Sequence, residues 1–145
     1  MPTFRAPMRS RRDDVAEGAA VARALDIGVC GLGGRLPEPP TSLAEALGAV
    51  SEAYDERSAR RLERFAEAPD GSAVWTRDAD GWYWSGTLNG PWRYDPAPEA
   101  FAVDLVHVRP CRWQDQPVPD LRVPSAVLET FARGGRNWQR IHAAG

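Results

Sequence analysis

The chain has 145 residues, enough for one domain with a hydrophobic core, and its formal net charge of -2 gives no bulk electrostatic case for or against nucleic acid. All 18 basic residues are arginine. Because lysine is absent, a Walker A phosphate loop, a Schiff-base enzyme and a lysine-activated nucleophile are excluded, while the arginines remain suited to phosphates and base edges.

The metal-ligating residue types are sparse. The cysteines and histidines are Cys30, Cys111, His107 and His142, with no close pairing, so we expect no metal site and no cofactor. We expect both thiols to be buried and reduced. No apolar run approaches the roughly 18 residues of a membrane span, and the N-terminal stretch has no apolar signal core. The sequence therefore predicts a soluble, cytoplasmic protein.

The N-terminal half has helical spacing around one short strand. Residues 1–12 carry four arginines and fit either a flexible basic arm or an edge strand. Ala-rich sequence predicts a helix over 13–27, and a short apolar run ending in glycines predicts a strand at 29–34. Helical spacing resumes after a cap at Thr41 or Ser42 and continues to residue 68.

From residue 72 the apolar pattern changes to a period of two, which predicts strands. Asn89-Gly90 predicts a tight hairpin between two of them. The expected strands are 72–77, 82–88, 92–94, 101–113 and 136–142, and a helix is expected at 123–134. This order predicts a single α+β domain over 1–145: a small, strongly curved β-sheet or barrel with helices packed around it.

The stretch 81–94, GWYWSGTLNGPWRY, has more aromatic rings than one face of a small sheet is expected to bury. Packing between neighbouring strands accounts for any single ring, but a cluster of rings beside arginines is also what stacking on a nucleobase requires. Gly86 marks either a sheet bend or a close approach of the backbone. The expected base-binding residues are Trp75, Trp82, Trp84, Trp92 and Tyr94, and the expected phosphate-binding residues are Arg77, Arg93, Arg136 and Arg140.

Four segments, SAVWTRDADG, WYWSGTLNGPWRYD, VDLVHVRPCRW and VPSAVLETFARGGRNWQRI, together resemble the PUA-like superfamily, which includes the EVE, YTH and SRA-type domains. The resemblance is greatest to bacterial domains of this kind in modification-dependent restriction systems. It implies a DNA-binding reader that flips a modified base into an aromatic cage, with 5-methylcytosine first and N6-methyladenine next, and a nuclease partner. Two places depart from the pattern: near the end of the strand at 29–34, where a Trp is expected, this chain has Gly34, and DGS at 70–72 stands where GD is usual.

Two other classes of function stay open. For an enzyme, Asp78 and Asp80 fall in an expected turn and His107 stands alone in an expected strand, so we expect no intrinsic catalysis. A protein-interaction or adaptor module with an exposed aromatic groove fits the near-neutral charge. Salt dependence separates this alternative from nucleic-acid binding. The choice between DNA and RNA, and a homodimer, also stay open.

Overall fold

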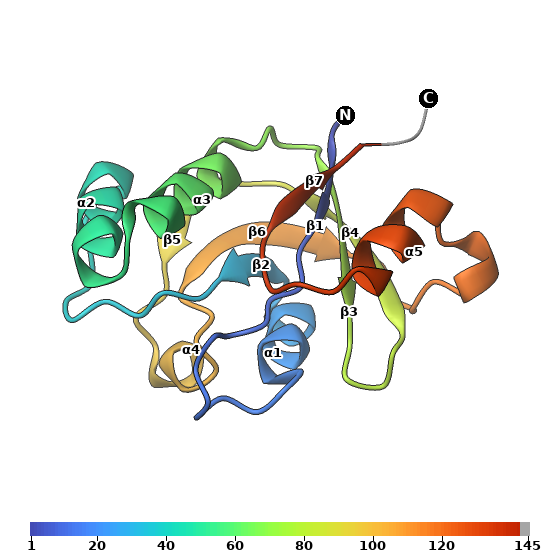
Figure 1. Ribbon diagram of the computed structural model, residues 1–145, viewed down its shortest axis with the longest axis horizontal. Coiled ribbons are helices and arrows are strands. Elements are labelled where there is room, and N and C mark those ends of the chain that lie inside the picture. Colours follow the sequence, from blue (N-terminus) through green and yellow to red (C-terminus); the bar gives the residue numbers. More distant parts are fainter. Residues whose placement is uncertain (143–145) are drawn as a thin grey trace.

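The computed structural model describes residues 1–142. It shows a mixed α+β fold built on one strongly curved, half-barrel sheet (Figure 1). The strands are β1 (Thr3–Arg5), β2 (Val29–Leu32), β3 (Ala73–Arg77), β4 (Tyr83–Leu88), β5 (Arg93–Tyr94), β6 (His107–Trp113) and β7 (Gln139–Ile141). The helices are α1 (Ala19–Ile27), α2 (Leu43–Ala53), α3 (Glu56–Glu67), α4 (Pro98–Ala102) and α5 (Ser125–Ala132). The predicted fold class and the predicted curvature are confirmed.

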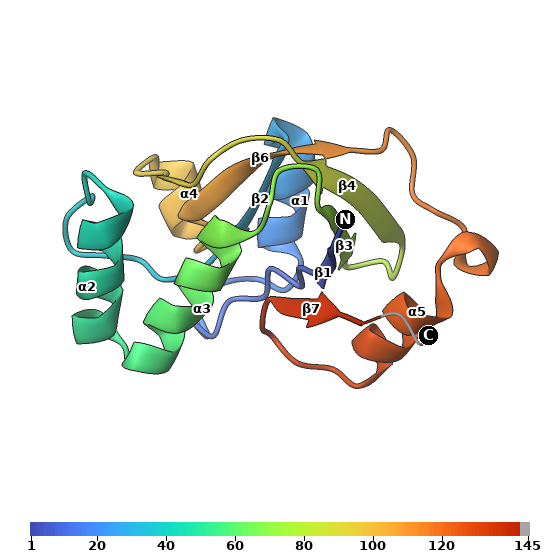
Figure 2. The ribbon, with the colours of Figure 1, turned by 90° about the horizontal axis from the view of Figure 1, so that it is seen from above.

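The sheet order is β2-β6-β4-β3-β1-β7, with β5 also paired to β6. Only β1 and β3 run parallel; the other pairs are antiparallel. Figure 2 shows α2 and α3 at one end of the sheet and α5 at the other. Over the described residues the longest helix has 12 residues, and none has both the length and the apolar composition for crossing a membrane.

The first residues of the chain belong to the sheet. In β1, Phe4 pairs with Val74 of β3 on one side and with Arg140 of β7 on the other. Phe4, Ala6 and Met8 are buried. Residues 3–5 therefore form an inner strand, rather than a free arm or an edge strand, because both of their hydrogen-bonding edges are occupied.

The prediction of a hairpin at Asn89-Gly90 is wrong. Strands β4 and β5 both pair antiparallel with β6, so the chain continues in one direction along β6. Neither residue has the positive φ that a type I′ turn requires. Glycine is needed here because the backbone passes close to Pro110: a Cβ on Gly90 would lie 2.6 Å from the Pro110 ring.

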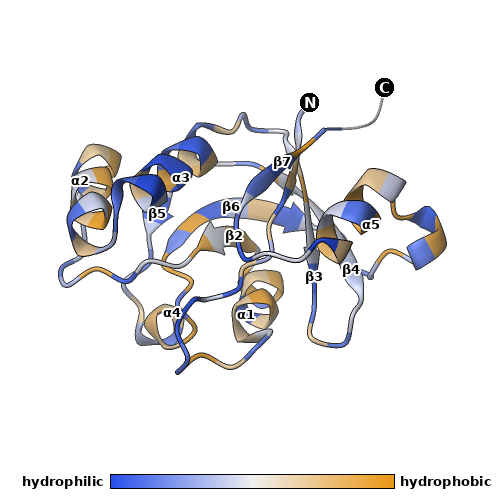
Figure 3. Cartoon of the chain, viewed as in Figure 1, coloured by the Kyte–Doolittle hydropathy of each residue, from blue (hydrophilic) through white to orange (hydrophobic). Residues whose placement is uncertain are grey.

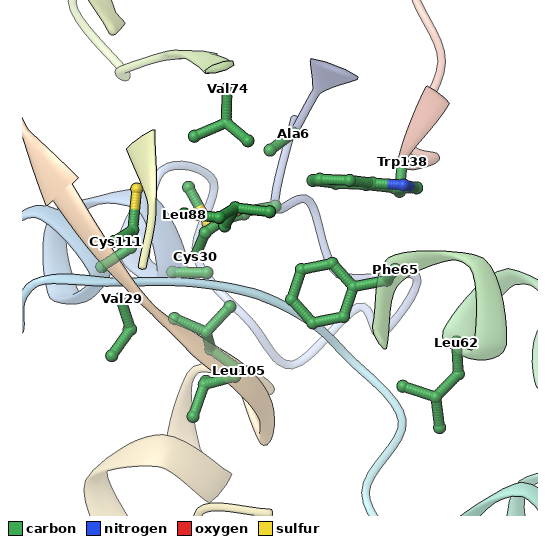
Figure 4. Packing of buried hydrophobic residues seen from close by; sticks show 14 of the residues in the cluster. Ala6, Val29, Cys30, Leu62, Phe65, Val74, Leu88, Leu105, Cys111 and Trp138 are labelled. Carbon is green, nitrogen blue, oxygen red and sulfur yellow. The ribbon is translucent and has the colours of Figure 1, made fainter. Parts of the chain in front are cut away.

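Two hydrophobic clusters cover opposite sides of β3. The larger one contains Val74 and packs the sheet against α1, α2 and α3; Figure 4 shows Phe65 of α3 pointing into it near Leu88. The smaller one contains Trp75, which alternates to the other side, and packs the sheet against α5. The sheet therefore buries large side chains on both faces, and this reduces the number of rings left for a surface pocket.

The continuous helical segment expected over 42–68 is broken at two residues, Tyr54 and Asp55. Ser42 caps α2 as expected, by accepting a hydrogen bond from the Glu45 N–H. The helix then ends, and Asp55 begins α3 by accepting a hydrogen bond from the Ser58 N–H at 2.7 Å. Tyr54 stands at the corner between the two helices, outside both of them.

Candidate functional site

Three of the five aromatic residues expected to bind a base lie on or beside β3 and β4, away from a shared cavity. Trp75 is buried, 9 % exposed, against Tyr83 in the smaller cluster. Trp82 is 53 % exposed at the end of the turn before β4. The Trp84 indole N–H donates a hydrogen bond to the carboxylate of Asp78, which fixes its ring beside that same turn. These rings do not surround a common cavity.

The other two rings of the expected set contact one histidine. Trp92 stacks on His107 with ring centroids 6.2 Å apart and donates its indole N–H to Nδ1 at 3.3 Å. Tyr94 meets the same imidazole edge-on at 5.3 Å, and its hydroxyl accepts a hydrogen bond from the Leu36 N–H. Trp92 and Tyr94 therefore contact His107, which lines a cavity, but they do not line that cavity themselves.

That cavity has a volume of about 370 Å³ and is the candidate site. Five segments enclose it: residues 8–12, the glycine-rich segment 31–34, the α2–α3 corner, residues 104–107 and the loop 136–138. Segments from both ends of the chain and from its middle therefore meet here, which explains why no continuous sequence motif describes the site.

One wall is backbone because three glycines leave no room for side chains. A Cβ on Gly31 would lie 2.5 Å from the carbonyl oxygen of His107, and one on Gly33 would lie 2.6 Å from the Asp104 carboxylate. Gly34 has a φ of +125°, which disfavours any side chain, and a Cβ there would be 3.2 Å from His107 Nε2. This glycine stands where the family resemblance leads one to expect a Trp.

Two aromatic rings form other parts of the wall. Tyr54 donates its hydroxyl proton to the Arg35 carbonyl at 2.6 Å, which fixes the ring direction. Burial, followed by the charge of Asp104, raises the pKa of the Tyr54 hydroxyl. Trp138 stacks on Phe4 at 4.5 Å and meets Phe65 edge-on at 5.0 Å. Both rings are held in place without a ligand.

His107 is neutral and has a defined tautomer. Its Nε2–H donates to the Gly34 carbonyl at 3.0 Å, and its Nδ1 accepts from Trp92. Burial lowers the His107 pKa to about 4, although the Gly34 hydrogen bond and the Asp104 charge act in the opposite direction. Since both ring nitrogens are engaged, this imidazole has no free position for a general base.

Asp104 joins two walls of the cavity. One carboxylate oxygen accepts the Gly34 N–H at 3.0 Å, and the other accepts the Ser10 hydroxyl at 2.7 Å. Its own backbone has a φ of 51°, an unusual conformation for a residue other than glycine. The carboxylate thus fixes the N-terminal segment 8–12 against the glycine wall.

The rim of the cavity is rich in arginine. The arginines that line it are Arg9, Arg11, Arg12, Arg61 and Arg136. Arg9 and Arg12 pair with exposed acidic residues, Glu17 and Asp14, and Arg11 donates to the Asn137 side chain. The Asp55 carboxylate caps α3 and, as a neighbouring negative charge, offsets part of the positive charge of Arg11 and Arg57.

Of the four arginines expected to bind phosphate, only Arg136 lines this cavity. Arg77 lies over the Tyr83 ring at 5.2 Å and donates to the Gly81 carbonyl. Arg93 and Arg140 are exposed on β5 and β7.

A buried arginine positions the loop at 136–138. Arg5 is 5 % exposed and donates to the carbonyl oxygens of Thr130, Gly134 and Asn137 at 2.8, 2.8 and 3.3 Å. These acceptors belong to the end of α5 and the loop that follows. The guanidinium therefore fixes the direction in which the loop carries Trp138 to the cavity.

Sequence reasoning missed Tyr54 and Trp138 as site residues. A signal existed for the first: Asp55 and Ser58 have the spacing of a new helix start, which places the preceding tyrosine at a corner. Trp138 fell in an expected strand, and nothing local shows that its ring faces a cavity.

No group of three or more His, Cys, Asp or Glu side chains in residues 1–142 is arranged to hold a metal ion. No protein-family model matches the chain, and no curated protein is significantly similar to it.

Proposed function

We propose that the protein binds nucleic acid and recognises a single modified base, 5-methylcytosine in DNA before N6-methyladenine, in the cavity between Tyr54 and Trp138. In this proposal the chain is a PUA-like reader domain that acts in the cytoplasm and does no chemistry itself. The observation that carries the proposal is an aromatic cavity of about 370 Å³ with an arginine-rich rim.

The cavity suits a small, flat and uncharged ring. Its volume lies at the small end of the roughly 300–1,000 Å³ typical of ligand pockets. Stacking on one aromatic side chain stabilises a bound base by about 1–3 kcal/mol. The wall of backbone formed by Gly31, Gly33 and Gly34 is rigid, so an added methyl group either fills space there or is rejected.

The charges around the cavity support selection of a nucleotide. Five arginines line it against two carboxylates, those of Asp55 and Asp104, so anionic phosphates are favoured at the rim. The Asp104 carboxylate lies at the glycine wall, where an uncharged heterocycle is favoured over an anion. A base can meet both requirements only when it is taken out of the stack. Because His107 and Asp104 have their polar atoms engaged, cleavage would depend on a nuclease partner.

The experiment is a fluorescence anisotropy series with matched oligonucleotides, each unmodified, with 5-methylcytosine or with N6-methyladenine, in single- and double-stranded form. Burying one methyl group contributes about 0.8 kcal/mol, so we expect at least about fourfold tighter binding of one modified probe. Affinity should fall as salt rises. Equal affinity for every probe would refute the reader, and salt-independent binding of a protein partner alone would favour the adaptor.

Two matched variants locate the base. Tyr54→Ala removes a half-exposed ring at the cavity and should abolish the preference for the modified probe. Trp82→Ala removes an exposed ring that lies outside the cavity and should leave that preference unchanged. The reverse result would place the cage at the β3–β4 turn.

A further inference from the structure

A second hollow adjoins the candidate cavity and is dominated by arginine. It has a volume of about 450 Å³, and the residues that line it are Arg5, Arg57, Arg60, Arg61, Arg64, Asn137, Trp138 and Gln139. Arg61, Asn137 and Trp138 line both hollows, so the two lie next to each other. We call the second one the arginine groove.

The arginines of α3 lie on one flank of the helix. Residues 57, 60, 61 and 64 recur at the three- and four-residue spacing that places side chains on the same face. Figure 3 shows α3 coloured hydrophilic along most of its length. Leu62 and Phe65 face the core instead. The groove is therefore formed by a rigid helix on one side and the 137–139 segment on the other.

This positive charge is poorly balanced inside the protein. Arg60 pairs with Glu56 at 3.7 Å, whereas the structure of residues 1–142 shows no ion pair for the other three arginines of α3. Burial, together with the positive charges of Arg11, Arg57 and Arg64, lowers the pKa of Arg61, and the charge of Asp55 offsets only part of this effect. Like charges held close together in excess over carboxylates are stabilised by an external anion.

We propose that the arginine groove holds the sugar-phosphate backbone of the strand whose base enters the neighbouring cavity. From Arg57 to Arg64 the helix rises about 10 Å, which spans roughly three phosphates of one strand when measured along the axis of a duplex. Arg61 stands where the two hollows join and takes the phosphate next to the flipped base. This inference rests on the proposed function but assigns phosphate contact to α3 rather than to β3 and β5.

The test compares two double variants of the full chain. R57Q/R64Q removes two charges that line only the groove, and R77Q/R93Q removes two exposed charges outside both hollows. Binding of a labelled single-stranded 12-mer, with and without a central 5-methylcytosine, is measured between 50 and 200 mM salt. Each lost phosphate contact lowers the slope of log affinity against log salt by about 0.7, so R57Q/R64Q should reduce it by about 1.4. R77Q/R93Q should leave the slope unchanged.

The outcomes separate the groove from the reader. An unchanged slope in R57Q/R64Q, or an equal fall in R77Q/R93Q, overturns the groove while any methyl preference of the wild type still supports the reader. A reduced slope without methyl preference in the wild type supports the groove and overturns the reader. Inorganic polyphosphate that competes as well as the oligonucleotide at equal phosphate concentration overturns a nucleic-acid strand as the occupant.

Discussion

Replacing Arg5 by methionine tests whether one buried guanidinium holds the loop that forms the cavity. The substitution removes three hydrogen bonds, of which the one to Thr130 is fully buried and those to Gly134 and Asn137 are partly buried. A buried acceptor left without a donor costs about 1–3 kcal/mol, and water can replace part of the other two bonds. The Arg5 Nε has no acceptor within residues 1–142, so its loss relieves one desolvated donor. We expect a net loss of about 3 kcal/mol.

Urea unfolding followed by circular dichroism measures this loss, and thermal unfolding should show a fall in Tm of roughly 10 °C. The control is Arg140→Met, an exposed arginine on the neighbouring strand β7, for which we expect a change within about 0.5 kcal/mol. If the two variants have the same free energy of unfolding, the guanidinium does not hold the loop and the account of the cavity wall fails.

Three further predictions concern other parts of the chain. Gly86→Ala should lower the free energy of unfolding by about 1–3 kcal/mol, because its Cβ would lie 2.7 Å from the Cys111 sulfur and from an indole carbon of Trp113. Gly48→Ala, with open space in α2, should raise it by about 0.5–1 kcal/mol, and chemical denaturation measures both changes. Because the His107 pKa is lowered to about 4 in the folded state, stability should be full above about pH 6.5 and fall by about 3 kcal/mol towards pH 4, and His107→Gln should remove most of that fall. Burial raises the pKa of both Cys30 and Cys111, the latter to about 12, so a thiol reagent at pH 8 should react only on unfolding, and rapid labelling of the native protein would contradict this burial.

The fold class could be predicted because its signals are local. The change from helical spacing to a period of two occurs near residue 72, and β3 begins at Ala73. The hairpin at Asn89-Gly90 could not be excluded locally, because the reason for the glycine is Pro110, which is remote in sequence. Gly86 illustrates the same limit: close approach and sheet bending look alike in sequence, and only the packing shows that Trp113 lies against it.

The candidate site was less predictable than the fold because burial depends on both faces of the sheet. Trp75 was expected at a cage on the assumption that one face of each strand meets a core. Helix α5 creates a second core on the other face, and Trp75 is buried in that core together with Val127. Without this second core, the Trp75 ring would be exposed on the outer face of the sheet, as the prediction assumed. The rings at the cavity instead come from a helix corner and a loop, Tyr54 and Trp138, where no periodic pattern applies.

The cavity is preformed, and this has a consequence for selectivity. Trp138 is fixed by Phe4 and Phe65, Tyr54 by the Arg35 carbonyl, and His107 by a hydrogen bond at each ring nitrogen. These side chains are already ordered in the folded protein, so binding a ligand costs little further conformational entropy. More of the contact free energy then appears as affinity. If the cavity binds a modified base as proposed, a rigid wall also cannot collapse onto a base that lacks the methyl group, and the resulting gap forfeits contacts outright. The proposed discrimination therefore depends on that rigidity, because methyl burial by itself gives only about a fourfold preference.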